Sequence, residues 1–148
     1  MPPGIVYHER QPFEYYVYAI AGATIVVLAV LPPHLPVNNA VIVVLLLAMH
    51  LLFEETTVTR DAVEVRFGYL LPMYRRTIAR ADIAEARAET YSPIGEFGGW
   101  GIRGLGGNVA LNARGNRGVR LTLRDGRRIL IGSQRPEELA AALALERL

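Results

Sequence analysis

The chain of 148 residues contains no cysteine. This absence excludes disulfide bonds, thiolate zinc sites, iron–sulfur clusters and thiol nucleophiles. Lysine is also missing, because all 16 basic residues are arginine. A chain without lysine cannot form a Schiff base, hold pyridoxal phosphate covalently or build the phosphate-binding loop that ends in Gly-Lys-Ser/Thr. No cofactor of these classes is expected.

Charge is absent from one long stretch of the sequence. The 39 residues from Tyr15 to Phe53 contain no Asp, Glu, Lys or Arg, although charged residues are common on both sides of them. This pattern divides the chain into an amino-terminal arm at residues 1–14, an apolar block at residues 15–53 and a domain of ordinary composition at residues 54–148.

The apolar block predicts a transmembrane helical hairpin. Residues 15–31 and 37–53 form two apolar runs, and Pro32, Pro33 and Pro36 lie between them. At 1.5 Å per residue each run reaches about 25 Å, close to the ~30 Å hydrocarbon core of a bilayer. Neither run has the polar stripe of a surface helix in a globular protein. We therefore expect two membrane-spanning helices and an integral membrane protein.

The positions of the arginines predict the orientation of this hairpin. Arg10 precedes it, Arg60 and Arg66 follow it, and the loop around His34 contains no arginine. Positive residues favour the cytoplasmic side of a membrane. Both termini are therefore expected in the cytoplasm, with the chain in the inner membrane and His34 on the periplasmic side.

Residues 54–148 show the alternation of β-strands, followed by one helix. Val63, Val65 and Phe67 alternate with polar residues, as in a half-buried strand. Residues 119–123 and 127–131 flank Asp125-Gly126, which predicts a hairpin with a type I′ turn. The segments 56–60, 74–79 and 108–114 are further candidate strands. Residues 136–148 open with proline and two glutamates and predict a carboxy-terminal helix.

Residues 82–91 carry conflicting signals. Their Ala, Glu and Arg content favours a helix, whereas Ala84, Ala86 and Ala88 alternate with charged residues as in a strand. We interpret the segment as a strand. The domain would then hold about seven antiparallel strands and a carboxy-terminal helix.

Several short motifs of this domain carry a resemblance to a known family. They are residues 66–68, Ile78, Asp82-Ile83, residues 97–103 and residues 131–139. With the apolar block before them, they resemble bacterial pleckstrin-homology-like proteins that carry a transmembrane hairpin. The resemblance implies a mainly-β barrel of bent antiparallel strands, with the last helix over one open end. It implies no particular activity.

The glycine-rich loop at Gly98, Gly99, Trp100 and Gly101 has two interpretations. Trp100 either fills the domain core between tight backbone turns, which we favour, or lies at a membrane surface beside Arg103. Residues 99–104 also match the dinucleotide fingerprint G-x-G-x-x-G, but a strand pattern follows where that motif needs a helix. Nucleotide binding is not expected.

Residues 98–135 contain eight arginines and a single acid, Asp125. The arginines with the best claim to a lipid or partner surface are Arg103, Arg120, Arg124, Arg127 and Arg128. They either attract anionic lipid headgroups or lie on solvated strand faces that point in several directions. No nucleic-acid recognition motif accompanies the charge, so nucleic acid is not an expected partner.

Catalytic residues are sparse. The histidines are His8, His34 and His50, the serines are Ser92 and Ser133, and no metal-ligand spacing occurs. The sequence therefore predicts a non-catalytic binding or assembly module that presents its domain to protein partners or to copies of itself. A peripheral sensor of anionic lipid headgroups is the alternative, and a small membrane enzyme is a remote one.

Overall fold

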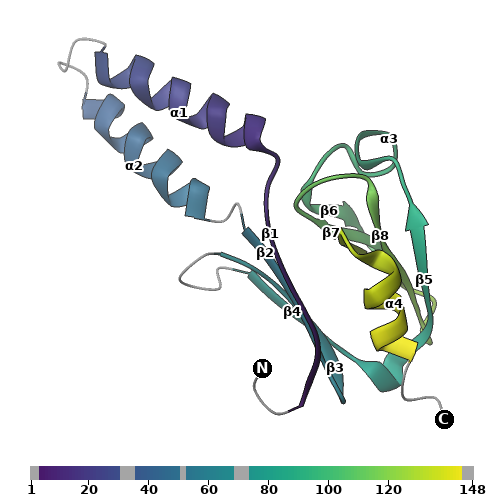
Figure 1. Cartoon of the computed structure of the whole chain (residues 1–148). Coiled ribbons are helices and arrows are strands. Elements are labelled where there is room, and N and C mark those ends of the chain that lie inside the picture. Colours follow the sequence, from purple (N-terminus) through teal and green to yellow (C-terminus); the bar gives the residue numbers. More distant parts are fainter. Residues whose placement is uncertain (1–3, 31–35, 51–52, 69–73, 145–148) are drawn as a thin grey trace.

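The computed structural model describes residues 4–30, 36–50, 53–68 and 74–144, which form two β-sheets, a helical hairpin and a carboxy-terminal helix (Figure 1). The two sheets together are called the β body. The hairpin, made of α1 (Tyr15–Val30) and α2 (Pro36–His50), projects from one end of it. The last helix, α4 (Pro136–Ala144), packs against β5 and β8.

The first sheet holds four antiparallel strands in chain order: β1 (Ile5–Pro12), β2 (Phe53–Thr59), β3 (Ala62–Phe67) and β4 (Tyr74–Ala79). The expected alternation in β3 is observed, since Val63, Val65 and Phe67 are buried. β1 enters the hairpin and β2 leaves it, and the two pair from Ile5 to Pro12. This pairing joins the two ends of the apolar block to the sheet.

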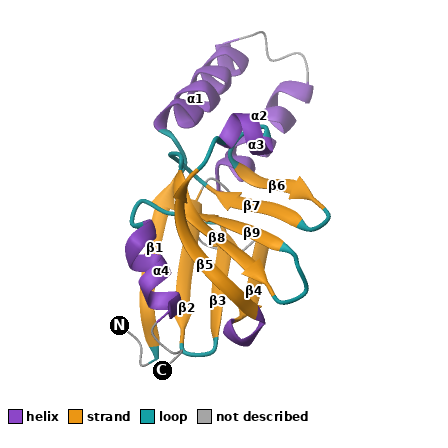
Figure 2. Cartoon of the chain, turned by 90° about the vertical axis from the view of Figure 1, so that its right-hand side faces the viewer, coloured by secondary structure: helices purple, strands orange, loops and turns teal. Residues whose placement is uncertain are grey.

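The second sheet has five strands in the order β5-β8-β9-β7-β6 (Figure 2). They are β5 (Ile83–Thr90), β6 (Gly101–Leu105), β7 (Asn108–Asn112), β8 (Arg117–Leu123) and β9 (Arg128–Gly132). The pair β7–β9 is parallel and the other pairs are antiparallel. A 3₁₀ turn, η1 (Arg80–Asp82), links β4 to β5, and a short helix, α3 (Pro93–Phe97), follows β5.

The hydrophobic core draws on both sheets and on α4. Val58 and Val65 of the first sheet and Leu121 of the second are fully buried in one cluster, which also includes Leu139 and Leu143 of α4. Helix α4 therefore presents its apolar face to the core, as its sequence predicts.

The strand predicted for residues 82–91 is confirmed, because β5 covers most of that segment. Here the alternation of apolar and charged residues predicted the structure better than helical propensity did, because Ile83–Thr90 pairs along its length with β8. The hairpin of β8 and β9 is confirmed as well. The type I′ turn is wrong: among the described residues no residue other than glycine has a positive φ, and only Gly126 does so in this turn. The Gly126 N–H donates to the Leu123 carbonyl at 3.0 Å, which fits a type I turn closed by a left-handed glycine.

The transmembrane hairpin is not supported, and this corrects the sequence prediction. Two helices do form, but no helix in the described ranges is long and apolar enough to cross a membrane. At 1.5 Å per residue the 16 residues of α1 reach about 24 Å, which is less than the ~30 Å hydrocarbon core of a bilayer. The second apolar run is not helical to its end, because α2 ends at His50 and Phe53 already belongs to β2. The expected integral membrane partner, the inner-membrane location and the cytoplasmic termini lose their basis, and His34 lies outside the described residues.

The expected fold class is also corrected. In place of about seven antiparallel strands behind a membrane hairpin, the described residues form nine strands in two sheets, one pair of them parallel. The two unexpected strands are β1, in the segment interpreted as an arm, and β6, in the glycine-rich segment.

Candidate functional site

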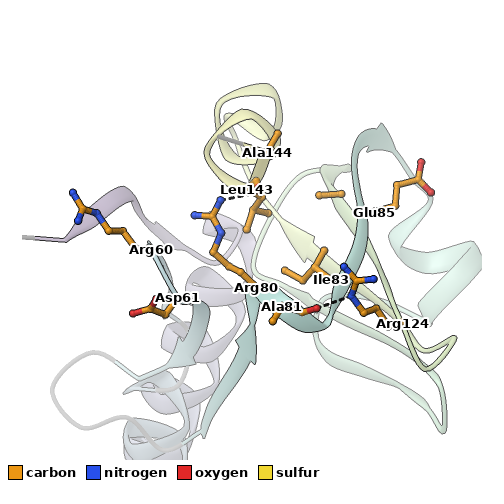
Figure 3. Close-up of a pocket in the computed structure, with 10 residues that line it drawn as sticks. Arg60, Asp61, Arg80, Ala81, Ile83, Glu85, Arg124, Leu143 and Ala144 are labelled. Carbon is orange, nitrogen blue, oxygen red and sulfur yellow. Dashed lines mark hydrogen bonds between the residues drawn. The ribbon is translucent and has the colours of Figure 1, made fainter. Parts of the chain in front are cut away.

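A pocket opens where the first sheet passes into the second, beside the end of α4 (Figure 3). Its volume is about 570 Å³, within the usual range for small-molecule sites. The β2–β3 turn, η1, β5, the β8–β9 turn and α4 all contribute to its wall. The lining residues are Arg60, Asp61, Arg80, Ala81, Ile83, Glu85, Ala86, Arg124, Leu143 and Ala144.

Arg80 is held in place by two backbone carbonyls. Its Nη1 donates to the Thr59 oxygen at 3.1 Å and its Nη2 to the Leu143 oxygen at 3.0 Å. The second bond satisfies a carbonyl in the last turn of α4, where a positive charge is favourable. One guanidinium therefore links the β2–β3 turn to the carboxy-terminal end of the helix.

Arg124 and Arg60 present exposed guanidinium groups at the same pocket. The Arg124 backbone N–H donates to the Asp82 carbonyl at 2.8 Å, and its Nε donates to the Ala81 carbonyl at 2.7 Å. These two bonds connect the β8–β9 turn to η1. No carboxylate of the described residues lies within 4.0 Å of Arg60 or of Arg124. The acidic lining residues Asp61 and Glu85 come from separate elements.

The helical hairpin is a second notable surface. Helix α1 has no buried residue. Eleven large apolar side chains of α1 and α2 are exposed, with Val30 at 80% and Leu47 at 66%. The remaining ones are Tyr15, Tyr16, Ile20, Val26, Val27, Val41, Val43, Val44 and Leu46. Monomeric proteins seldom expose so large a continuous apolar surface.

The arginines expected on one shared surface are distributed among different environments. Arg124 lines the pocket, and Arg127 pairs with Asp125 at 2.6 Å. Arg120 contacts Glu89 at 2.6 Å and Glu96 at 2.9 Å. Arg103 donates from Nε to the Trp100 carbonyl at 2.9 Å, and Arg128 is exposed at the start of β9.

The glycine-rich loop follows α3 and leads into β6. Gly98 ends α3 with φ +72°, a left-handed cap that glycine adopts without steric cost. Gly99 is buried and Gly101 begins β6. Trp100 is half-buried against the core cluster, and its Nε1 donates to the Gly115 carbonyl at 2.8 Å. Its ring meets Tyr16 of α1 edge-on, with centroids 6.3 Å apart.

Sequence reasoning missed a buried polar cluster between the sheets. Glu9 of β1 accepts hydrogen bonds from Tyr7 and Ser133 at 2.6 Å each and from the Gln134 N–H at 2.9 Å. Burial raises the pKa of Glu54 well above the ordinary value, and the nearby Glu9 charge raises it further. The sequence shows only that Tyr7, Glu9 and Gln11 alternate along one face of the first strand, and this alternation does not reveal which distant residues bury them.

The histidines, serines and acidic residues are the side chains of this chain that could carry catalytic or metal chemistry. No cluster of three His, Asp or Glu residues suited to a metal occurs in the part of the chain that the structure describes. Ser133 is fully buried by its partners, and Ser92 caps α3 by accepting from the Gly95 N–H. His8 lies on β1 beside Thr57 and Glu55.

No family model matches the chain, and no curated protein matches it either. The resemblance to pleckstrin-homology-like proteins with a transmembrane hairpin is therefore not supported. It depended on short motifs and on two membrane-spanning helices, which the described residues do not contain.

Proposed function

We propose that this chain is a non-catalytic assembly module that pairs with a second copy of itself through the hairpin of α1 and α2. The observation that carries the proposal is the exposed apolar surface of this hairpin. A helix that is apolar on all sides is normally covered by other protein or by lipid. In α1 none of the residues is buried by the rest of the chain.

The chemistry of the hairpin favours a partner of the same kind. Neither helix contains Asp, Glu, Lys or Arg, so a charged partner surface would lose its solvation without gaining an ion pair. A matching surface must be apolar and uncharged, and a second hairpin meets both conditions. Two antiparallel hairpins related by a twofold axis would form a four-helix bundle, a common arrangement for helices of this length.

The available area agrees with such a pairing. The exposed fractions of the eleven apolar side chains correspond to about 1,000 Å² per chain, taking roughly 150 Å² for each whole residue. Covering more than half of it on both copies buries about 1,000–2,000 Å² in total, the range of specific protein interfaces.

Anionic lipid headgroups are a less well supported partner. Five of the eight arginines of residues 98–135 have a carboxylate within 4.0 Å, and most of these carboxylates lie outside that segment. The positive charge that the sequence suggests is therefore largely compensated.

Sedimentation analysis of the full chain tests the proposal. The wild type should dimerise, and Leu47→Glu should be monomeric because a carboxylate would be buried at the interface. Leu105→Glu is the matched control, since Leu105 is 92% exposed and belongs to β6 rather than to the hairpin. A monomeric wild type that instead binds neutral lipid vesicles, or an equal effect of Leu105→Glu, would contradict the proposal.

A further inference from the structure

Three elements that line the pocket, namely η1, the β2–β3 turn and the end of α4, lie at the opposite end of the two sheets from the helical hairpin (Figures 1 and 2). Pairing through the hairpin would leave the pocket open, so the pocket needs an explanation of its own. We propose that this pocket binds a small monoanion: an apolar chain that ends in one carboxylate.

The lining supplies an apolar wall. Ile83 of β5 and Leu143 of α4 contribute branched side chains, and Ala81, Ala86 and Ala144 leave space between them. In Figure 3 Ile83 lies between the side chains of Arg80 and Arg124. An alkyl chain in contact with this wall would leave water for an apolar environment, which is favourable in proportion to the area covered.

The charged residues of the lining select the head group. Three arginines and two carboxylates give the described residues of the lining a formal net charge of +1. A single carboxylate matches this balance, whereas the second charge of a phosphate would meet Asp61 and Glu85 without compensation.

The two hydrogen bonds that Arg124 makes to η1 fix its position before a ligand arrives. Its Nε donates to the Ala81 carbonyl and its backbone N–H to the Asp82 carbonyl. Among the described residues, no carboxylate lies within 4.0 Å of its terminal nitrogens. A guanidinium held in this way can donate to an incoming carboxylate with little loss of side-chain freedom.

Calorimetric titration of the full chain with octanoate tests the proposal. Octanoate should bind saturably at one site per chain, and both 1-octanol and inorganic phosphate should bind at least about tenfold more weakly, because each lacks one half of the match. Arg124→Gln should weaken octanoate binding by about tenfold. Arg128→Gln is the matched control, because Arg128 is exposed nearby on β9 but does not line the pocket.

Arg60→Gln keeps the test decisive if Arg124→Gln disturbs the β8–β9 turn. Arg60 is exposed in the β2–β3 turn, so its substitution should leave the fold intact and still weaken octanoate. Octanoate bound to the apolar hairpin would not respond to either arginine. Equal binding of 1-octanol, tighter binding of phosphate, no saturable site, or equal losses in Arg60→Gln and Arg128→Gln would overturn the proposal.

Discussion

Gln11 donates from its side-chain nitrogen to a carboxylate oxygen of Glu54 at 3.1 Å, and the same nitrogen donates to the Gly132 carbonyl at 3.0 Å. Gln11 and Glu54 lie opposite each other on β1 and β2, while Gly132 belongs to β9 of the other sheet. One amide therefore links the two sheets at a place where a fully buried carboxyl would otherwise have little to bond with.

Glu54→Gln should stabilise the protein at neutral pH. Burial, and then the charge of Glu9, raise the pKa of Glu54 above its ordinary value near 4.5. The folded chain binds this proton more tightly than the unfolded chain does. The contribution of Glu54 to stability is therefore complete below about 4.5 and is lost as the pH rises through the folded pKa. Glutamine resembles the protonated carboxyl and removes this loss.

Urea unfolding at several pH values between 5 and 8 measures the effect. The free energy of unfolding of Glu54→Gln should exceed that of the wild type by an amount that grows with pH. The groups whose charge acts on this site are Glu9 and Tyr91, and burial raises the pKa of Tyr91 to about 12, so Tyr91 stays neutral in this range. Glu64→Gln, on the half-exposed face of β3, serves as control and should show no such growth.

Glu9→Gln should have the opposite effect, although Glu9 is also buried. Its carboxylate accepts from two hydroxyl groups and one backbone N–H. A glutamine amide would point N–H groups at some of these donors. We expect a loss of about 2–4 kcal/mol in unfolding free energy, measured at pH 7 by the same method. A loss below 1 kcal/mol would show that the cluster tolerates an amide.

These two glutamates illustrate what the sequence could predict and what it could not. The β8–β9 hairpin was predictable, because its alternation and its Asp-Gly turn are local signals. Strand β1 was not, because Glu9 and Gln11 are buried only through partners more than 40 residues away. A polar residue in an isolated segment gives no sign of a distant hydrogen-bond partner.

The apolar block was misread for a related reason. A run without charge reports only that the segment avoids water, and it does not record where helix gives way to strand. Here α2 ends at His50 and β2 begins at Phe53, with Glu54 already facing the interior of the β body. In the arginine-rich segment, likewise, most of the counter-charges lie elsewhere in the chain, and the local sequence does not reveal those pairings.

Trp100 should report on the attachment of the hairpin to the β body. It is the only tryptophan, and its ring contacts Tyr16 of α1. Tyr16→Ala should shift its fluorescence emission to longer wavelength, because water replaces the tyrosine ring. Tyr15→Ala should leave the emission unchanged, since Tyr15 is 79% exposed and its described ring contact is with Tyr16. The same shift in both variants would contradict a specific contact.

Arg120→Gln should destabilise the fold, because this arginine is part of the β body rather than of an open surface. Its side chain is only 19% exposed, it bonds to Glu89 and Glu96, and it lies over the ring of Phe97 at 6.0 Å. We expect a loss of about 1–3 kcal/mol in unfolding free energy, measured by urea titration. Arg128→Gln should change it by less than about 0.5 kcal/mol, as is usual for an exposed position. Equally small effects in both variants would return Arg120 to the exposed partner surface that the sequence predicts.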